Sequence, residues 1–230
     1  MTRLVIFDLD GTLLNTLDDL AAAANFALER HGLPGHPTEA YKQFVGNGVF
    51  KLVERMTPES RRTDKALLAS IKADFDAYYA EHNEDCTKPY DGVLELLDTL
   101  RTRGIACTVL SNKPHEFTKV LCSQYFGKRI PLAFGHRQGY PHKPEKALVE
   151  EILKLTGIPA EQTVYVGDSG VDMQTAKNAG VYAAGVLWGF RGREELKKNG
   201  ADALISSPQE LLKIPDARPR QYLPRMLLYK

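Results

Sequence analysis

The sequence is short of cysteine, of net charge and of long hydrophobic runs, and each shortage excludes a class of protein. Its three cysteines, Cys86, Cys107 and Cys122, are too few and too scattered for a disulfide framework or a zinc site, so we expect reduced, buried thiols. Lys and Arg number 30 and Asp and Glu number 29, which gives a formal net charge of +1. A charge this small provides no attraction for nucleic acid or for an anionic membrane. We therefore expect neither as a partner.

No segment is hydrophobic enough to cross a membrane or to direct export. The apolar run near the start of the chain, Leu4 to Phe7, ends at Asp8. A signal peptide needs roughly 7–15 apolar residues, and a membrane-spanning helix needs about 20. The composition, 43% hydrophobic and 26% charged over 230 residues, is typical of a globular protein and excludes a disordered chain. We expect a cytoplasmic protein of one large or two small domains.

Short apolar runs alternate with amphipathic stretches along most of the chain. Such runs form strands that are buried on both faces, as in a parallel sheet. Between them, apolar residues recur with helical spacing, for example over 93–100 and over 143–156, where we expect Pro144 in the first turn of a helix. The pattern predicts an α/β fold, a doubly wound, Rossmann-like sandwich around a parallel sheet. Its expected strands are 4–7, 105–110, 131–134, 163–166, 182–187 and 203–205.

One stretch interrupts this alternation with helical patterns alone. No convincing strand pattern occurs from Asn15 to Cys86, and Thr38 is placed to cap one of the helices there. The tail from Arg218 to Arg225 is basic and interrupted by proline, so we expect a loosely ordered end. We predict a helical domain at 15–86 that is inserted into a core domain of residues 1–14 and 87–230.

Two short motifs place pairs of carboxylates at the ends of predicted strands. Asp8 and Asp10 follow the first strand, and residues two apart on an extended chain point to the same side. Asp168 and Asp172 follow the fourth strand and lie at the start of the next helix. Each motif also has a purely structural interpretation, which is Asx-turn chemistry for the first and helix capping for the second.

Taken together, the two motifs indicate a site for cations. Ligands of open α/β sheets bind beyond the carboxyl ends of the strands, so all four carboxylates would meet at one edge. A pair of like charges ~4 Å apart costs about 4 kcal/mol at an effective dielectric constant of 20, whereas total stability is only ~5–15 kcal/mol. Lys143 supplies one compensating charge. A hard divalent cation with oxygen ligands, for which Mg²⁺ is the best match, would supply another.

Two further strand ends offer groups that suit an anionic oxygen. Ser111 and Asn112 follow the second strand with a hydroxyl and an amide, although a polar turn after a strand has the same composition. Lys143, directly before Pro144, would stand at the N-terminus of its helix, where its charge opposes the helix dipole. This unfavourable position favours a functional role for the lysine.

Taken in order, these residues resemble the four motifs of the haloacid-dehalogenase (HAD) superfamily. The helical insertion resembles the cap of its phosphoglycolate-phosphatase-like members, and the likeness extends to about Ile214. The second aspartate of the first motif indicates the phosphotransferase branch, because the dehalogenases themselves lack it. The residues that carry the resemblance are Asp8-Leu-Asp10-Gly-Thr12, Ser111-Asn112, Lys143-Pro144 and Gly167-Asp168-Ser-Gly-Val-Asp172.

The resemblance implies a phosphatase that uses Mg²⁺ and an aspartyl-phosphate. Asp8 would attack phosphorus, and Asp10 would protonate the leaving oxygen and then activate water. The Asp8 carboxylate, the Asp10 backbone carbonyl and Asp168 would hold Mg²⁺, with Asp172 on the metal side or behind these ligands. The substrate partner would be a small phosphomonoester, with 2-phosphoglycolate as the first choice.

The resemblance also implies a cradle for the phosphoryl group and a cap that recognises the rest of the substrate. Thr12, Ser111, Asn112 and Lys143 would bind the phosphoryl oxygens. The loop Gly46-Asn47-Gly48 resembles the substrate loop of such caps, where backbone amides approach a ligand at a helix N-terminus. An ordinary turn between two helices has the same pattern.

Other functions stay open on the motifs alone. A β-phosphoglucomutase-like phosphomutase or a pyrophosphatase of the same superfamily would also keep Asp8 and Asp10. A phospho-acceptor receiver domain uses similar groups, but it has no helical insertion after the strand of its nucleophile. Lys51 and Arg55 could meet a substrate carboxylate, although solvated surface charge explains them better. The sequence leaves open whether the protein is a monomer or a homodimer.

Overall fold

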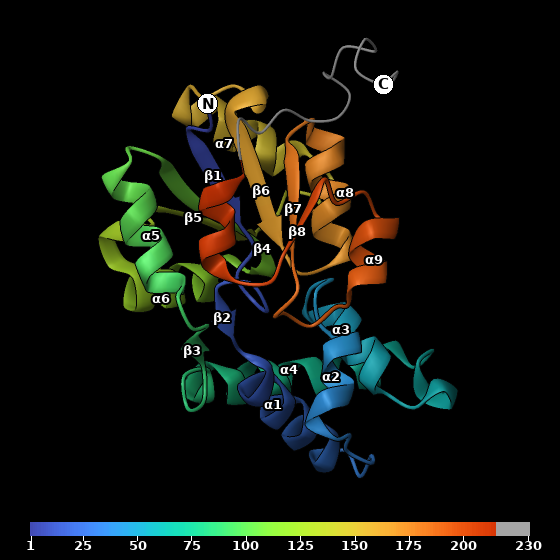
Figure 1. Cartoon of the computed structure of the whole chain (residues 1–230). Coiled ribbons are helices and arrows are strands. Elements are labelled where there is room, and N and C mark those ends of the chain that lie inside the picture. The colour runs from blue at the N-terminus through green and yellow to red at the C-terminus, as the bar shows by residue number, and fades with distance from the viewer. Residues whose placement is uncertain (215–230) are drawn as a thin grey trace.

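The computed structural model describes residues 1–214 and contains a main sheet of six parallel strands (Figure 1). The strands are β1 (Leu4–Phe7), β4 (Ala106–Pro114), β5 (Leu132–His136), β6 (Thr163–Gly167), β7 (Tyr182–Val186) and β8 (Ala203–Ile205). They lie in the order β5-β4-β1-β6-β7-β8, so the strand order reverses at β1. Ligand sites in such sheets lie at this reversal, beyond the carboxyl end of the strand. The predicted loosely ordered tail lies outside the described residues.

Helices cover both faces of this sheet, because its central strands carry apolar side chains on both faces. Along β1, Leu4 and Ile6 pack into one core and Val5 and Phe7 into the other. The alternation follows from the opposite directions of successive side chains in a strand, and it confirms the predicted doubly wound α/β fold. The face that carries Leu4 and Ile6 is covered by α7 (Ala147–Thr156), α8 (Gly170–Ala179) and α9 (Arg193–Lys198). The face that carries Val5 and Phe7 is covered by α5 (Val93–Thr102), α6 (His115–Phe126) and the 3₁₀ helix η4 (Pro208–Lys213).

Two local predictions around the sheet are wrong. The helix expected from Lys143 begins at Ala147, and Lys143 stands in the preceding loop with a cis peptide bond to Pro144. The helix dipole therefore does not act on this lysine. Ser111 and Asn112 lie within β4 rather than after it, because this strand runs on past the end of its apolar segment.

The stretch between β1 and α5 folds into a helical cap with its own core. Its helices are α1 (Leu17–Arg30), α2 (Thr38–Phe44), α3 (Val49–Met56) and α4 (Lys65–His82). Thr38 opens α2 but makes no capping hydrogen bond, so the predicted cap is wrong. In Figure 1 the four helices lie below the sheet, on the side where β1 ends. The cap thus stands over the edge that carries the predicted site.

The two connections between cap and core form a small antiparallel ladder. β2 (Leu14–Asn15) pairs with β3 (Lys88–Pro89). On the cap side, the buried Asp19 of α1 accepts hydrogen bonds from the backbone N–H groups of Cys86 and Thr87, at 2.8 Å each, and from the Thr87 hydroxyl at 2.7 Å. These contacts hold the two connections side by side, near residues 15 and 86, where the sequence predicts the boundaries of the helical domain.

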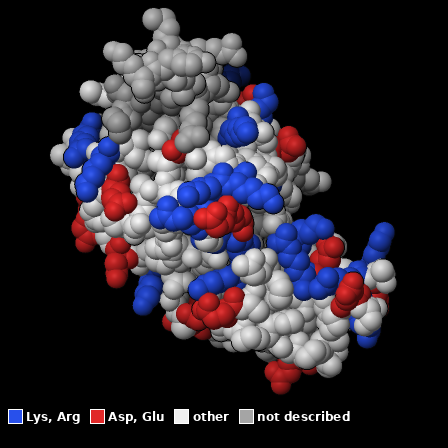
Figure 2. Space-filling model, turned by 45° about the vertical axis from the view of Figure 1, so that its right-hand side comes forward, with Lys and Arg blue, Asp and Glu red and all other residues white. Residues whose placement is uncertain are grey.

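The three thiols differ in their exposure, and acidic and basic side chains are mixed on the face shown in Figure 2. Cys107 and Cys122 are buried as expected, whereas Cys86 is exposed, so the expectation is wrong for that residue. On the face in Figure 2, basic and acidic side chains lie next to one another on both core and cap. Within residues 1–214, none of the helices is both long enough and apolar enough to cross a membrane.

Candidate active site

Asp8 lies buried at the carboxyl end of the central strand. Its backbone N–H donates to Val166 O at 2.9 Å, which fixes it between β1 and β6. Lys143 Nζ lies 2.9 Å from Asp8 Oδ1. The chain then turns at Gly11 with φ of 81°, where an added Cβ would overlap the Asp168 carboxylate. Glycine is the residue that allows both this φ and this close approach.

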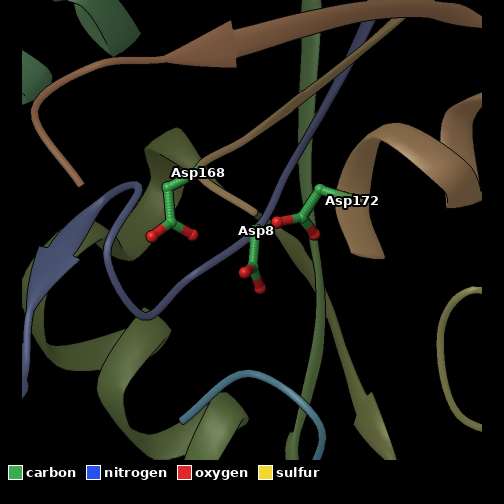
Figure 3. A group of neighbouring side chains, drawn as sticks. All are labelled: Asp8, Asp168 and Asp172. Atoms are coloured by element: carbon green, nitrogen blue, oxygen red, sulfur yellow. The ribbon is translucent and has the colours of Figure 1, made fainter. Parts of the chain in front are cut away.

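Asp8, Asp168 and Asp172 form a buried acidic triad. One oxygen of each lies within 4.8 Å of those of the other two, and Figure 3 shows the three carboxylates approaching one another. Burial, and next the charge of Asp172, raise the pKa of Asp8 to about 7. Burial and the charges of Asp172 and Asp8 raise the pKa of Asp168 well above its usual value. The triad therefore favours cations that offset its charge.

Lys143 supplies one such cation from the loop before α7. Its Nζ donates to Asp172 Oδ1 at 2.8 Å and to Leu110 O at 3.2 Å, in addition to its ion pair with Asp8. Burial alone would lower the pKa of Lys143, but Asp172 and Asp8 raise it well above its usual value, so the lysine is charged. Contact with two carboxylates explains why a lysine stands at this buried position.

Asp172 also stabilises the start of α8. Ser169 Oγ and Ser169 N donate to Asp172 Oδ2 at 2.6 and 3.1 Å, and Asp172 N donates back to Ser169 Oγ at 3.3 Å. This reciprocal pair is a capping box, which satisfies backbone donors at a helix N-terminus. Helix capping and a role in the acidic triad thus coexist in one motif.

The triad keeps oxygens that fit a divalent cation. Asp172 uses Oδ1 for Lys143 and Oδ2 for Ser169, and Asp168 Oδ2 accepts from the Phe190 N–H at 2.7 Å. Within residues 1–214, the buried Asp8 Oδ1 has no hydrogen-bond partner and meets Lys143 as an ion pair. Carboxylate oxygens are the donors that hard divalent cations prefer. The residues present therefore fit Mg²⁺.

Asp10 rests against a lysine that the sequence analysis missed. Lys113 Nζ lies 3.2 and 3.3 Å from the two Asp10 oxygens, and its side chain is 3% exposed. Burial would lower the pKa of Lys113, but Asp10 and then Tyr79 raise it, so this lysine is charged too. The sequence carries no clear signal for it, because Lys113 follows the apolar run that ends at Leu110, and the structure alone extends β4 to this residue. Its partner lies 103 residues away in the sequence.

Ser111 and Thr12, two of the predicted phosphate-binding residues, differ in their access to the site. Ser111 lines the same pocket as Asp8, and its hydroxyl accepts a hydrogen bond from the Lys113 N–H at 3.3 Å. Thr12 is buried, and its hydroxyl has no hydrogen-bond partner among the described residues. It is not among the residues that line the pocket.

Asn112 joins the core to the cap through its side chain. Both hydrogens of its amide are used, one for Gly46 O of the cap loop at 3.0 Å and one for Lys143 O at 3.4 Å, and its Oδ1 accepts from the Lys143 N–H at 2.8 Å. Arg191 donates to the neighbouring loop carbonyl, Val45 O, at 2.9 Å. The core thus donates hydrogen bonds to two successive backbone carbonyls of the cap. Because both amide hydrogens of Asn112 are used, its side chain has no donor left for phosphate.

The predicted substrate loop stands at the junction of cap and core. Gly48 precedes α3 with φ of 84°, and an added Cβ would lie 2.8 Å from His142 Cε1. Asn47 faces the cap, since its Oδ1 accepts from Arg55 Nη2 at 2.8 Å. Lys51 forms an exposed ion pair with an acidic neighbour on the same helix. Gly46 and Gly48 line the pocket, whereas Asn47, Lys51 and Arg55 do not.

The acidic edge and the cap enclose a pocket with two different sides. The core contributes Asp8, Asp10, Ser111, Asn112, Lys113, Pro114 and Phe117. The cap contributes Leu20, Val45, Gly46, Gly48, Val49, Leu52, Phe75 and Tyr79. Charged and polar groups therefore face a wall that, apart from Tyr79, is apolar or glycine.

A parallel α/β sheet with carboxylates and buried lysines at one edge, covered by a helical insertion, defines a two-domain α/β protein with a capped candidate active site. Comparison with known proteins gives the family. Residues 5–186 match the haloacid dehalogenase-like hydrolases, and the chain belongs to this family.

Relatives with known names support this membership. The chain is 34% identical over 216 residues to a phosphoglycolate phosphatase from Pseudomonas putida, covering 92% of this chain and 79% of that one. It is 30% identical over 217 residues to a phosphoglycolate phosphatase from Vibrio parahaemolyticus, covering 92% and 95%. An inferred phosphoglycolate phosphatase from Lactobacillus delbrueckii subsp. bulgaricus superposes with a TM-score of 0.87 at 33% identity, covering 92% and 97%. These matches identify the chain as an enzyme of the phosphatase type.

Proposed function

We propose that the chain is an Mg²⁺-dependent phosphatase that hydrolyses a small phosphomonoester, with 2-phosphoglycolate as the first choice, through an aspartyl-phosphate on Asp8. One observation carries the proposal. Asp8 lies at the end of the central strand in a buried acidic triad, is paired with Lys143, and opens into the same pocket as Asp10. The likeness to phosphoglycolate phosphatases supports the choice of substrate.

The carboxylates of Asp8 and Asp168 would hold Mg²⁺, with the Asp10 backbone carbonyl as a third ligand. When bound, the cation offsets negative charge between the nucleophile and the phosphoryl oxygens. Asp172 stands behind these ligands, because both of its oxygens are used by Lys143 and Ser169. Burial and neighbouring carboxylates raise the pKa of both Asp8 and Asp168, and a cation at this edge would offset that charge.

Two displacements at phosphorus complete the reaction. An Asp8 carboxylate oxygen attacks phosphorus, and the bond to the leaving oxygen breaks as Asp10 gives that oxygen a proton. Asp10 then takes a proton from water, which attacks the same phosphorus and breaks its bond to Asp8. Phosphate leaves and Asp8 is regenerated. The Ser111 hydroxyl and the Asn112 backbone N–H would donate hydrogen bonds to the phosphoryl oxygens, and the charge of Lys143 beside Asp8 would stabilise them.

The pocket wall favours a small leaving group. The cap side is mostly apolar, so the hydroxyls of a hexose phosphate would find few hydrogen-bond partners there. This observation favours a phosphatase of small esters over a phosphomutase. A pyrophosphatase would need several cations around its leaving phosphate. In the described residues that line the pocket, Lys113 is the basic side chain, and it is paired with Asp10.

Phosphate release with Mg²⁺ across a panel of phosphoesters tests the function. The panel contains 2-phosphoglycolate, sugar phosphates, nucleotides and pyrophosphate. We expect the highest kcat/KM with 2-phosphoglycolate and loss of turnover in excess EDTA. Undiminished turnover in EDTA would exclude the metal-dependent mechanism. Preference for pyrophosphate, or conversion of a hexose phosphate to its isomer, would replace the proposal by the corresponding alternative.

A further inference from the structure

The pocket is lined by a buried ammonium that the proposed phosphoryl transfer does not use. Lys143 already stands beside Asp8, whereas Lys113 lies at the end of β4 and lines the side of the pocket next to Asp10. A buried charge is costly unless it is paired, and Asp10 provides the partner. A lysine ammonium has three N–H donors. The two Asp10 oxygens are the acceptors that Nζ has within residues 1–214, which leaves a donor for an oxygen of the substrate.

A buried hydroxyl on the cap lies next to this ammonium. Tyr79 of α4 lines the same pocket, and Lys113 Nζ is 4.6 Å from the centroid of its ring. The Tyr79 side chain is buried; its hydroxyl is near enough to Lys113 for each group to affect the pKa of the other, but no hydrogen bond of ordinary length joins it to another described residue. Burial raises the pKa of Tyr79 to about 12, so the hydroxyl keeps its proton at neutral pH. Buried polar groups are rarely left without a partner, and a ligand oxygen would supply one here.

We propose that Lys113 and Tyr79 form a subsite for a carboxylate on the leaving group, so that the enzyme selects short phosphomonoesters of hydroxy acids. The inference rests on the proposed function and names the groups that recognise its substrate. An ammonium and a neutral hydroxyl are both donors, which suits an anion. Most of the remaining cap wall is apolar and offers a carboxylate no competing partner: Leu20, Val49, Leu52 and Phe75.

The position of the subsite also orients the leaving oxygen. In 2-phosphoglycolate a single carbon separates the carboxylate from the ester oxygen. Because Lys113 holds Asp10 as well, a carboxylate on Lys113 brings that ester oxygen beside Asp10. Lys113 belongs to the core and Tyr79 to the cap, so the subsite is complete only when the cap lies over the core. Substrate recognition and exclusion of water would then occur together.

A pair of matched substrates tests the subsite. We compare kcat/KM for 2-phosphoglycolate with kcat/KM for ethyl phosphate, which has a methyl group in place of the carboxylate. Lys113→Met also disturbs Asp10 and lowers both values, but we expect the ratio between them to fall about 10- to 100-fold, as for a lost charge-assisted hydrogen bond. Lys113→Arg should keep most of the preference. Tyr79→Phe should lower the ratio by about 5-fold, in line with one neutral hydrogen bond.

Tyr41→Phe provides the matched control. Tyr41 is another fully buried tyrosine of the cap, but its hydroxyl donates to Asn25 Oδ1 away from the pocket. We expect this variant to leave the substrate ratio unchanged. An unchanged ratio in Tyr79→Phe and in folded Lys113→Met would overturn the subsite. Equal kcat/KM for the two substrates in the wild-type enzyme would overturn it as well, while phosphatase activity would still stand.

Binding without turnover separates this inference from the proposed function. Titration calorimetry in the presence of Mg²⁺ compares 3-phosphonopropionate, a non-hydrolysable analogue of 2-phosphoglycolate, with propylphosphonate. The subsite predicts tighter binding of the carboxylate analogue, by about 10-fold or more, and loss of this advantage in Lys113→Met. If neither ester is hydrolysed but the advantage is observed, the subsite holds and the phosphatase proposal fails. Equal affinities would reject the subsite whatever the activity.

Discussion

Asp8 and Asp10 are separated by one residue, yet each has its own buried lysine. Lys143 lies beside Asp8, and Lys113 lies beside Asp10. The surroundings differ further, since Asp8 belongs to the acidic triad whereas Asp10 faces the apolar wall of the cap. This difference suits the proposed roles, which are attack at phosphorus for Asp8 and proton transfer at the leaving group for Asp10.

Substitution of each aspartate separates these roles. Asp8→Asn should abolish turnover, because an amide cannot form the acyl-phosphate. Asp10→Asn should keep the nucleophile but slow the reaction by about 10²–10⁴-fold, as for a lost general acid–base. Binding of trifluoroberyllate, a mimic of the aspartyl-phosphate, should persist in Asp10→Asn and vanish in Asp8→Asn. Equal binding by Asp8→Asn and wild type would show that another residue is the nucleophile.

At this scale the sequence predicts the residues that form short motifs and misses those defined by distant contacts. Asp8, Asp168 and Asp172 can be located because strand ends carry them to one edge. Lys113 cannot, because its role depends on Asp10 and on Tyr79 of the cap. The individual roles in catalysis and metal binding stay predictions until the variants are measured.

Among the elements, α8 connects helix stability to the acidic triad. Its capping box joins Ser169 to Asp172, the same residue that pairs with Lys143. Ser169→Ala removes the cap and should lower the free energy of unfolding by about 1 kcal/mol. Denaturant unfolding measures this change. Ser123→Ala, at an exposed position within α6, is the control and should change stability by less than about 0.5 kcal/mol. Equal effects of the two substitutions would show that the cap contributes nothing.

The loop before α3 should govern substrate choice. Gly46 and Gly48 have φ of 110° and 84°, and valine at position 48 would also press against His142. The double variant Gly46→Val/Gly48→Val should lose much of its kcat/KM for the best substrate and far less for acetyl phosphate, which needs little from the cap. Gly32→Val is the control, because Gly32 has φ of 64° but no atom near its Cβ position. Equal losses for both substrates, with the circular dichroism unchanged, would assign the loop to closure or stability.

At the scale of elements, the limits of prediction have local physical causes. Apolar runs predict the strands because burial on both faces requires them. The start of α7 was misplaced because Pro144 suits a first helical turn, whereas here it belongs to the loop that brings Lys143 to the triad. β2 and β3 have two residues each, which is too short for any alternation to show in the sequence.

For the whole molecule, the acidic triad links stability to pH and to metal. The pKa of Asp8 is about 7 in the metal-free fold, against 3.8 for the ordinary group. The folded state therefore keeps a proton that the unfolded chain has lost, and this contribution to stability disappears as the pH rises through about 7. Mg²⁺ needs the ionised carboxylate, so its effect should have the opposite pH dependence.

Thermal unfolding at pH 5.5 and pH 8 measures this linkage. The rise in Tm on adding Mg²⁺ should be larger at pH 8 than at pH 5.5 for the wild type. In Asp8→Asn it should be much smaller at both pH values. NaCl at equal ionic strength controls for screening. A magnesium effect that is independent of pH would contradict the assignment of Asp8 as a ligand.

Because the ladder between β2 and β3 holds both connections of the cap side by side, the cap is a segment that could be cut out and replaced at this one place. Paired residues of an antiparallel ladder lie only about 4.5–5.5 Å apart, so excision of the chain between Asn15 and Lys88 leaves two ends that a tight turn can join. The cap core draws its buried residues from the cap segment except for Phe190, and the two cores of the sheet draw theirs from the core segments. A foreign helical domain joined there would need to supply the loop carbonyls that Asn112 and Arg191 bind. Chimeras joined there would exchange the Tyr79 half of the leaving-group subsite, while Lys113 and the phosphoryl chemistry stay with the host.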